Sequence, residues 1–143
     1  AIKAASGNIS TYKEIWNALH DELSVLVAVD SPPLIDMLSY GSHGALIGIS
    51  AIATKKWAEL LSLIDQNELR LANELFDKVC RPLMASVFEN QQPKRPTSEA
   101  GSVKEALRQM GQLQNSLVRP PAVNVDEEVI REIHESLKVS GLI

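Results

Sequence analysis

The residue whose type and position most favour chemistry is Lys3, in the opening stretch AIKAASGNIS. It lies in a short apolar run just before a Ser-Gly-Asn loop signal. A lysine at the end of a strand usually extends its charged amine into water. A lysine amine that is held out of water can instead act as a nucleophile, because desolvation lowers its pKa. Which of these roles Lys3 has depends on the elements around it.

Other residue types that carry chemistry form weaker patterns. Cys80 is the single cysteine, which excludes an intramolecular disulfide and a multi-cysteine zinc site within these residues. The 3 histidines lie far apart and lack the spacing of metal ligands, so no metal site is predicted. Gly41, Gly44 and Gly48 do not have the spacing of a nucleotide-binding loop and are interpreted as turn and packing residues.

Composition limits the class of protein. The 143 residues are 45% apolar, enough for one domain with a hydrophobic core. A net charge of -4 with scattered basic residues favours neither nucleic acid nor a membrane surface as a partner. The sequence has no apolar run of membrane-spanning length and no signal-peptide pattern, so we expect a cytoplasmic protein.

The first half alternates short apolar runs with amphipathic segments. Strands are predicted at residues 1–4, 23–29 and within 40–50, and Pro32 and Pro33 end the second strand and begin a short helix. A capping box at Thr11 and Glu14 predicts the helix after the first strand, and Thr54 is expected to cap the helix after the third. This order predicts a parallel sheet with helices outside it.

The second half is predicted to contain helices alone. The apolar spacing indicates a helix over 67–90 with a kink at Pro82, a polar loop over 91–101, and a helix over 102–111 that ends at Gly111. An extended segment and a last helix over 126–139, with acidic residues in its first turn, complete the chain. Three buried parallel strands need more strands beside them, so the sheet is incomplete by itself.

Four stretches in this order resemble the dihydrodipicolinate synthase and N-acetylneuraminate lyase family: IKAASGN, VDSPPLIDML, GSHGALIGIS, and VKEALRQMG followed by VRPP. The resemblance implies the C-terminal part of a (β/α)8 barrel, which has about 250 residues when complete. Residues 1–66 would be the last three β/α units, strands six to eight, and residues 67–143 a helical C-terminal extension. The N-terminal half of the barrel, with strands one to five, would then be missing, and this chain would be a fragment, a nicked chain or one half of a two-part barrel.

In this family the lysine that matches Lys3 forms a Schiff base with pyruvate or another 2-oxo acid. The resemblance therefore implies that Lys3 points into a packed barrel, where burial keeps part of the amine unprotonated. It implies a lyase or synthase that needs no metal or organic cofactor. Pyruvate and an aldehyde such as aspartate semialdehyde would be its substrates, and a homotetramer its assembly. The resemblance equally allows a 2-keto-3-deoxy or 4-hydroxy-2-oxo acid aldolase.

Active sites of such barrels lie at the carboxyl ends of the strands, so the resemblance places Asp30, Ser31, Leu46 and Ile47 at the substrate. The family usually has Gly-acid-acid where this chain has Val29-Asp30-Ser31. It has a serine in place of Ile47, and often an asparagine in place of Ala51. These departures leave fewer hydrogen-bonding groups for a polyhydroxylated substrate, which favours a smaller or more apolar one. They also leave open a non-catalytic relative that binds a 2-oxo acid or a partner subunit.

Overall fold

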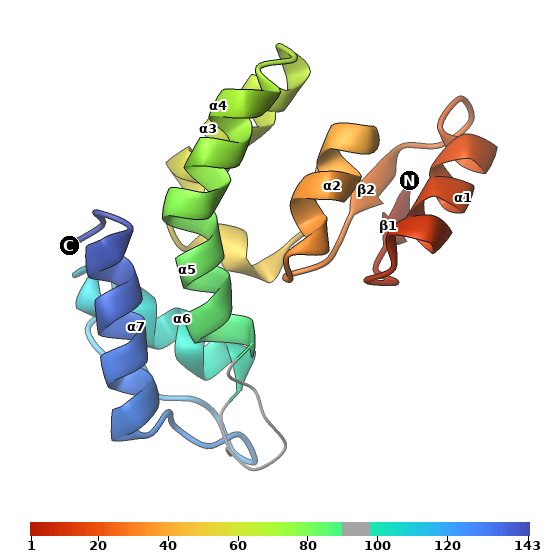
Figure 1. The fold of residues 1–143 in the computed structure, drawn as a ribbon. Coiled ribbons are helices and arrows are strands. Elements are labelled where there is room, and N and C mark those ends of the chain that lie inside the picture. Colours follow the sequence, from red (N-terminus) through yellow and green to blue (C-terminus); the bar gives the residue numbers. More distant parts are fainter. Residues whose placement is uncertain (90–97) are drawn as a thin grey trace.

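The computed structural model describes residues 1–89 and 98–143. Most of the loop predicted over 91–101 falls outside these residues. In Figure 1 the strands and first helices form one side of the molecule and the last helices form the other, with a long helical run between them. No helix in the two described stretches is both long and apolar enough to cross a membrane.

The first two predicted strands form a short parallel pair. Strand β1 (Ile2–Ala4) pairs with β2 (Val25–Val27) so that Lys3 lies opposite Leu26. Between them runs α1 (Ile9–Leu19), and β2 is followed by α2 (Pro33–Tyr40). Pro33 begins α2 as predicted, because its fixed φ suits a first turn and its missing N–H is not needed there.

The third predicted strand is wrong as a regular element. Within 40–50 only Ala45 forms a parallel bridge, to Val27, and the chain then turns into the 3-10 helix η1 (Gly48–Ala51). His43 N, Val27 N and Leu46 N form the backbone hydrogen bonds that connect this segment to β2. In the described residues these backbone bonds join the segment to β2, and η1 follows two residues after Leu46.

Two predicted helix caps are also wrong. Helix α1 is capped by Asn8, three residues before the start of the expected capping box, because the Asn8 side chain accepts hydrogen bonds from Ser10 N and Thr11 N. Helix α3 (Thr54–Asp65) is preceded by Ala53 in a left-handed conformation, and the Thr54 hydroxyl donates to Ser50 O rather than capping the helix.

The helix predicted over 67–90 is a series of segments with different helical pitch. Helix α4 (Leu69–Leu75) continues through the π-turn η2 (Phe76–Cys80), α5 (Arg81–Met84) and the π-turn η3 (Ala85–Glu89). Pro82 lacks an N–H, and the wider turn η2 comes just before it, with Arg81 N donating to Phe76 O. At the predicted kink the helical pitch therefore changes.

The last two helices end close to where they were predicted to end, but the first of them begins at Glu99 rather than at residue 102, so residues 99–101 of the predicted loop are helical. Helix α6 (Glu99–Gln109) is followed by Gly111 in a left-handed conformation, and α7 (Glu127–Val139) is capped by the Asp126 side chain, which accepts from Val129 N. Helices α6 and α7 pack against each other and against η3.

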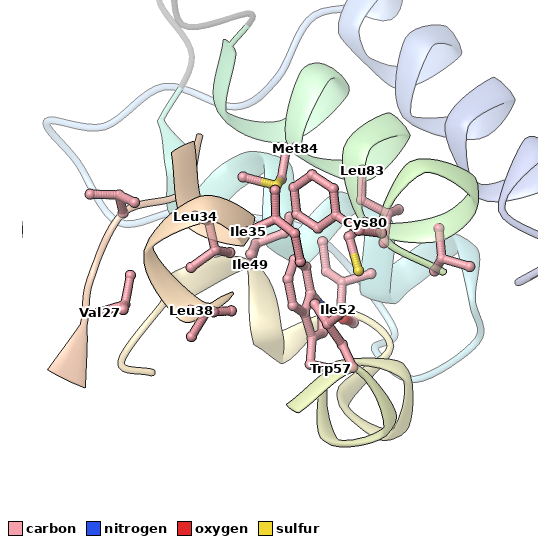
Figure 2. Packing of buried hydrophobic residues seen from close by; sticks show 14 of the residues in the cluster. Val27, Leu34, Ile35, Leu38, Ile49, Ile52, Trp57, Cys80, Leu83 and Met84 are labelled. Carbon is pink, nitrogen blue, oxygen red and sulfur yellow. Dashed lines mark hydrogen bonds between the residues drawn. The ribbon is translucent and has the colours of Figure 1, made fainter. Parts of the chain in front are cut away.

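One hydrophobic cluster holds the two sides of the molecule together. Figure 2 shows Ile35, Ile49 and Ile52 from the strand-bearing side next to Leu83 and Met84 from α5. All five side chains are buried. The predicted boundary between residues 66 and 67 falls between α3 and α4, and the core continues across it.

Candidate active site on the open face of the strands

Lys3 lies on the side of the sheet that the helices do not cover. Its neighbours Ile2 and Ala4 turn toward the helices, and Ala4 is buried. Lys3 itself is exposed, and Leu26, its partner in the register, is half-buried between two buried valines. The expected burial of Lys3 is absent in the described residues, because helices pack on only one face of this two-stranded sheet.

Leu46 lies on the same face as Lys3. Because Ala45 pairs with Val27, which faces the helices, the residues on either side of Ala45 face the other way. Leu46 is 54% exposed there, and a Cβ added at Gly44 would lie 3.5 Å from Cδ2 of Leu26. Lys3, Leu26 and Leu46 therefore form one continuous surface.

Asp30 ends this surface, and its carboxylate is held by backbone amides. Oδ1 accepts from Ile49 N at 2.9 Å and Oδ2 from Gly48 N at 3.2 Å, and the residue is half-buried. The carboxylate caps the start of η1 and connects it to the end of β2. The sequence does not indicate this bond, because the two partners lie far apart along the chain.

Ser31 and Ile47, the two other residues predicted to contact the substrate, make other contacts in the structure. The Ser31 carbonyl accepts from Leu34 N and opens α2. Ile47 turns toward the helices, where it lines an apolar cavity of about 200 Å³ with residues that include Leu38, Ala45 and Trp57. The structure thus brings Lys3, Leu46 and Asp30 to one face and places Ile47 on the opposite one.

A buried tyrosine supports the segment that carries Leu46. Tyr12 is fully buried, and its hydroxyl donates to Gly41 O at 2.7 Å. Burial raises the pKa of Tyr12 to about 12, which keeps the hydroxyl protonated as a donor. Val25 N donates to Nδ1 of His43 at 3.1 Å, a second bond that holds this segment against β2.

The surface has no grouping suited to a metal ion. Among residues 1–89 and 98–143, no three His, Cys, Asp or Glu side chains come together as possible ligands. The cationic and carboxylate groups at this face are Lys3 and Asp30. An amine near the carboxyl ends of parallel strands can attack a carbonyl carbon, which is the chemistry that this arrangement permits.

Comparison with known proteins gives a consistent result. The sequence profile of the Dihydrodipicolinate synthetase family matches residues 1–140. A 4-hydroxy-tetrahydrodipicolinate synthase from Neisseria meningitidis serogroup B is 30% identical over 140 residues, which are 98% of this chain and 45% of that protein. The chain therefore spans about half the length of the curated relatives that it matches.

Solved structures share the fold. Dihydrodipicolinate synthase from Acinetobacter baumannii, solved in complex with pyruvate, superposes with a TM-score of 0.84 at 24% identity and covers 99% of this chain and 45% of that one. The Thermotoga maritima protein gives a TM-score of 0.82 at 26% identity over 99% of this chain and 46% of its own. These proteins are (β/α)8 barrels, so the predicted partial barrel is confirmed as a fold. The numbering of its strands stays a prediction.

Proposed function

Because the chain belongs to the dihydrodipicolinate synthetase family, we propose that it is part of a Schiff-base lyase or synthase that acts on pyruvate or a related 2-oxo acid. Lys3 is the proposed nucleophile. The observation that carries the proposal is the position of Lys3 on the open strand face, with Leu46 beside it and Asp30 at its end.

The proposed reaction involves no net oxidation or reduction and therefore needs no redox cofactor. The unprotonated amine of Lys3 attacks C2 of the 2-oxo acid, and loss of water gives a protonated imine. This imine withdraws electrons, so a proton leaves C3 and an enamine forms. The enamine carbon then attacks an aldehyde carbon, the aldehyde oxygen takes up a proton, and water hydrolyses the imine to release the product and the lysine. The reverse sequence is the lyase reaction.

Further parts of the proposal follow from the family. The N-terminal half of the barrel would cover the Lys3 face and exclude water from the amine, and aspartate semialdehyde is the first candidate for the aldehyde. A homotetramer in the cytoplasm is the proposed form of the protein. Ser31 in place of an acid and Ala51 in place of an asparagine leave fewer polar groups than the family usually has, which favours a small or apolar aldehyde.

Borohydride trapping tests the proposal directly. The full-length protein that carries this chain is incubated with pyruvate and reduced with sodium borohydride, and the modified peptide is located by mass spectrometry. We expect a stable adduct on Lys3 that disappears in Lys3→Ala and persists in Lys55→Ala, a matched change of an exposed lysine. An unmodified Lys3 in folded protein contradicts the proposed chemistry.

A non-catalytic relative is the second candidate function. The observation that favours it is the Asp30 carboxylate, whose two oxygens are already bonded to Ile49 N and Gly48 N. Such a protein would bind a 2-oxo acid or a partner subunit without forming an imine. Calorimetric binding of pyruvate together with an unmodified Lys3 supports this candidate over the enzyme.

A further inference from the structure

The helical extension reaches the substrate end of the strands through Phe88. This residue lies in η3 and is half-buried. A Cβ built on Gly48 would lie 3.2 Å from Cζ of Phe88 and 3.8 Å from Oδ2 of Asp30. The tip of the aromatic ring and the carboxylate therefore border the same exposed point of η1, where a Cβ in place of the glycine hydrogen would require a small shift of the ring.

This point lies at the end of the face that carries Lys3. Residues 25–30 alternate between buried and half-buried, and Leu26 and Asp30 both belong to the half-buried set. Leu26 is level with Lys3, and Asp30 follows just beyond the carboxyl end of β2. A substituent that extends from an imine at Lys3 past the end of β2 would therefore approach this point.

We propose that Phe88 is a specificity-determining residue that limits the length of the group attached beyond the reacting carbon of the 2-oxo acid. The inference rests on the proposed function, because it needs an imine at Lys3 as the fixed point from which length is measured. The ring is rigid and apolar, and it lies beside Gly48, whose amide is bonded to the Asp30 carboxylate. A short substituent fits, whereas a long or hydroxylated one meets the ring edge or loses its water without a partner.

A competition experiment tests the inference on the full-length protein. Equal concentrations of pyruvate and 2-oxo-4-phenylbutanoate are added, borohydride is used to reduce the imines, and the two Lys3 adducts are quantified by mass spectrometry. We expect the parent protein to favour pyruvate. Phe88→Ala is expected to raise the ratio of phenylbutanoate adduct to pyruvate adduct about tenfold, because it opens the end of the face.

A second aromatic residue of the extension provides the control. Phe76 is fully buried in η2, where its ring lies under the Arg81 guanidinium, and it is not among the near neighbours of Gly48. Phe76→Leu and Phe88→Leu are compared at a temperature where circular dichroism shows both folded. We expect only Phe88→Leu to shift the ratio.

The outcomes separate the two proposals. A pyruvate adduct with an unchanged ratio in Phe88→Ala and Phe88→Leu overturns the role of Phe88 and leaves the proposed function standing. An equal shift in Phe76→Leu also overturns it, because a general loosening of the extension would then explain the result. If pyruvate gives no adduct in the parent protein, the proposed function fails, and the inference fails with it.

Discussion

Gly41 is the residue at which the segment leading to Leu46 meets α1. Its φ is 154°, and an added Cβ would lie 2.6 Å from Cε2 of Trp16. Trp16 cannot withdraw easily, because its ring stacks on His20 and contacts His43, each at 5.0 Å between ring centroids. The carbonyl of the same glycine accepts the Tyr12 hydroxyl. A side chain at this position would therefore disturb two contacts at once.

We predict that Gly41→Ala destabilises the protein by about 2–4 kcal/mol, through overpacking added to an unfavourable backbone conformation. Urea unfolding followed by circular dichroism measures the change. Gly111→Ala is the matched control: Gly111 also has a positive φ, of 72°, but an added Cβ would meet nothing within 4 Å. Its cost should be about 1 kcal/mol. Equal costs for the two variants would show that the Trp16 contact is unimportant.

At the scale of elements, Glu105 connects α6 to α7. Its side chain is 1% exposed and accepts hydrogen bonds from Arg108 and from Gln109, whose Nε2 also donates to Ile130 O in α7. Burial alone would raise the pKa of Glu105, but hydrogen bonds from Arg108, Ser116 and Gln109 and the charge of Arg108 lower it overall. The network therefore favours an ionised carboxylate in the folded state.

This network predicts a pH dependence. Because folding lowers the pKa of Glu105 from its ordinary value of 4.5, its stabilisation is complete above that value and is lost as the pH falls through the lower folded value. We expect Glu105→Gln to cost about 2 kcal/mol at pH 7 and the difference from the parent to shrink as the pH falls below the ordinary value. Chemical denaturation at pH 7, 5 and 3.5 measures it.

The control is an ion pair on the surface. Arg70 and Glu74 are bonded on α4, with side chains 75% and 59% exposed. Glu74→Gln should cost less than about 0.5 kcal/mol at any of these pH values, because water screens the pair. A Glu105→Gln cost that stays constant with pH would contradict the role assigned to the carboxylate.

Elements could be predicted from sequence where the determining residues are neighbours. Gly111 and Asp126 mark helix ends by contacts within their own turn, and Pro33 begins α2 for a reason internal to its ring. The third strand could not be predicted in this way, because a strand depends on partners elsewhere, and residues 43–46 have one partner, β2. The π-turns η2 and η3 likewise have no simple pattern in the sequence.

The same distinction, between contacts among chain neighbours and contacts between distant segments, applies to the candidate site. The position of Lys3 in a short strand could be predicted, because an apolar run followed by a loop signal is local. The bonding of Asp30 to Gly48 and Ile49, and the approach of Phe88 to Gly48, join segments far apart in the chain. No local pattern indicates them, so they emerge only from the fold.

At the scale of the whole molecule, the hydrophobic core extends across the predicted domain boundary between residues 66 and 67. Ile49 and Ile52 are fully buried, and Leu83 and Met84 lie next to them. We predict that residues 1–66 alone do not fold cooperatively, because removing the extension exposes these side chains to water. Near-ultraviolet circular dichroism of residues 1–66 and 1–143 tests this prediction.

A native-like spectrum and a sharp thermal transition for residues 1–66 would contradict that expectation. Residues 67–143 serve as the reciprocal fragment, because they lose the same contacts from the other side. If mixing the two fragments restores the spectrum of the intact chain, the shared core alone is sufficient to assemble them.

The 2 tryptophans give this molecule two built-in optical reporters. Trp16 on α1 contacts the imidazole rings of His20 and His43, whereas Trp57 is buried on α3 and donates through Nε1 to Ile52 O. Fluorescence from the first reports on the helix beside the Lys3 strand, and fluorescence from the second reports on the contact between α3 and η1. Single-tryptophan versions would therefore reveal, by emission wavelength and intensity, whether the Lys3 face and the interior lose their structure in one step.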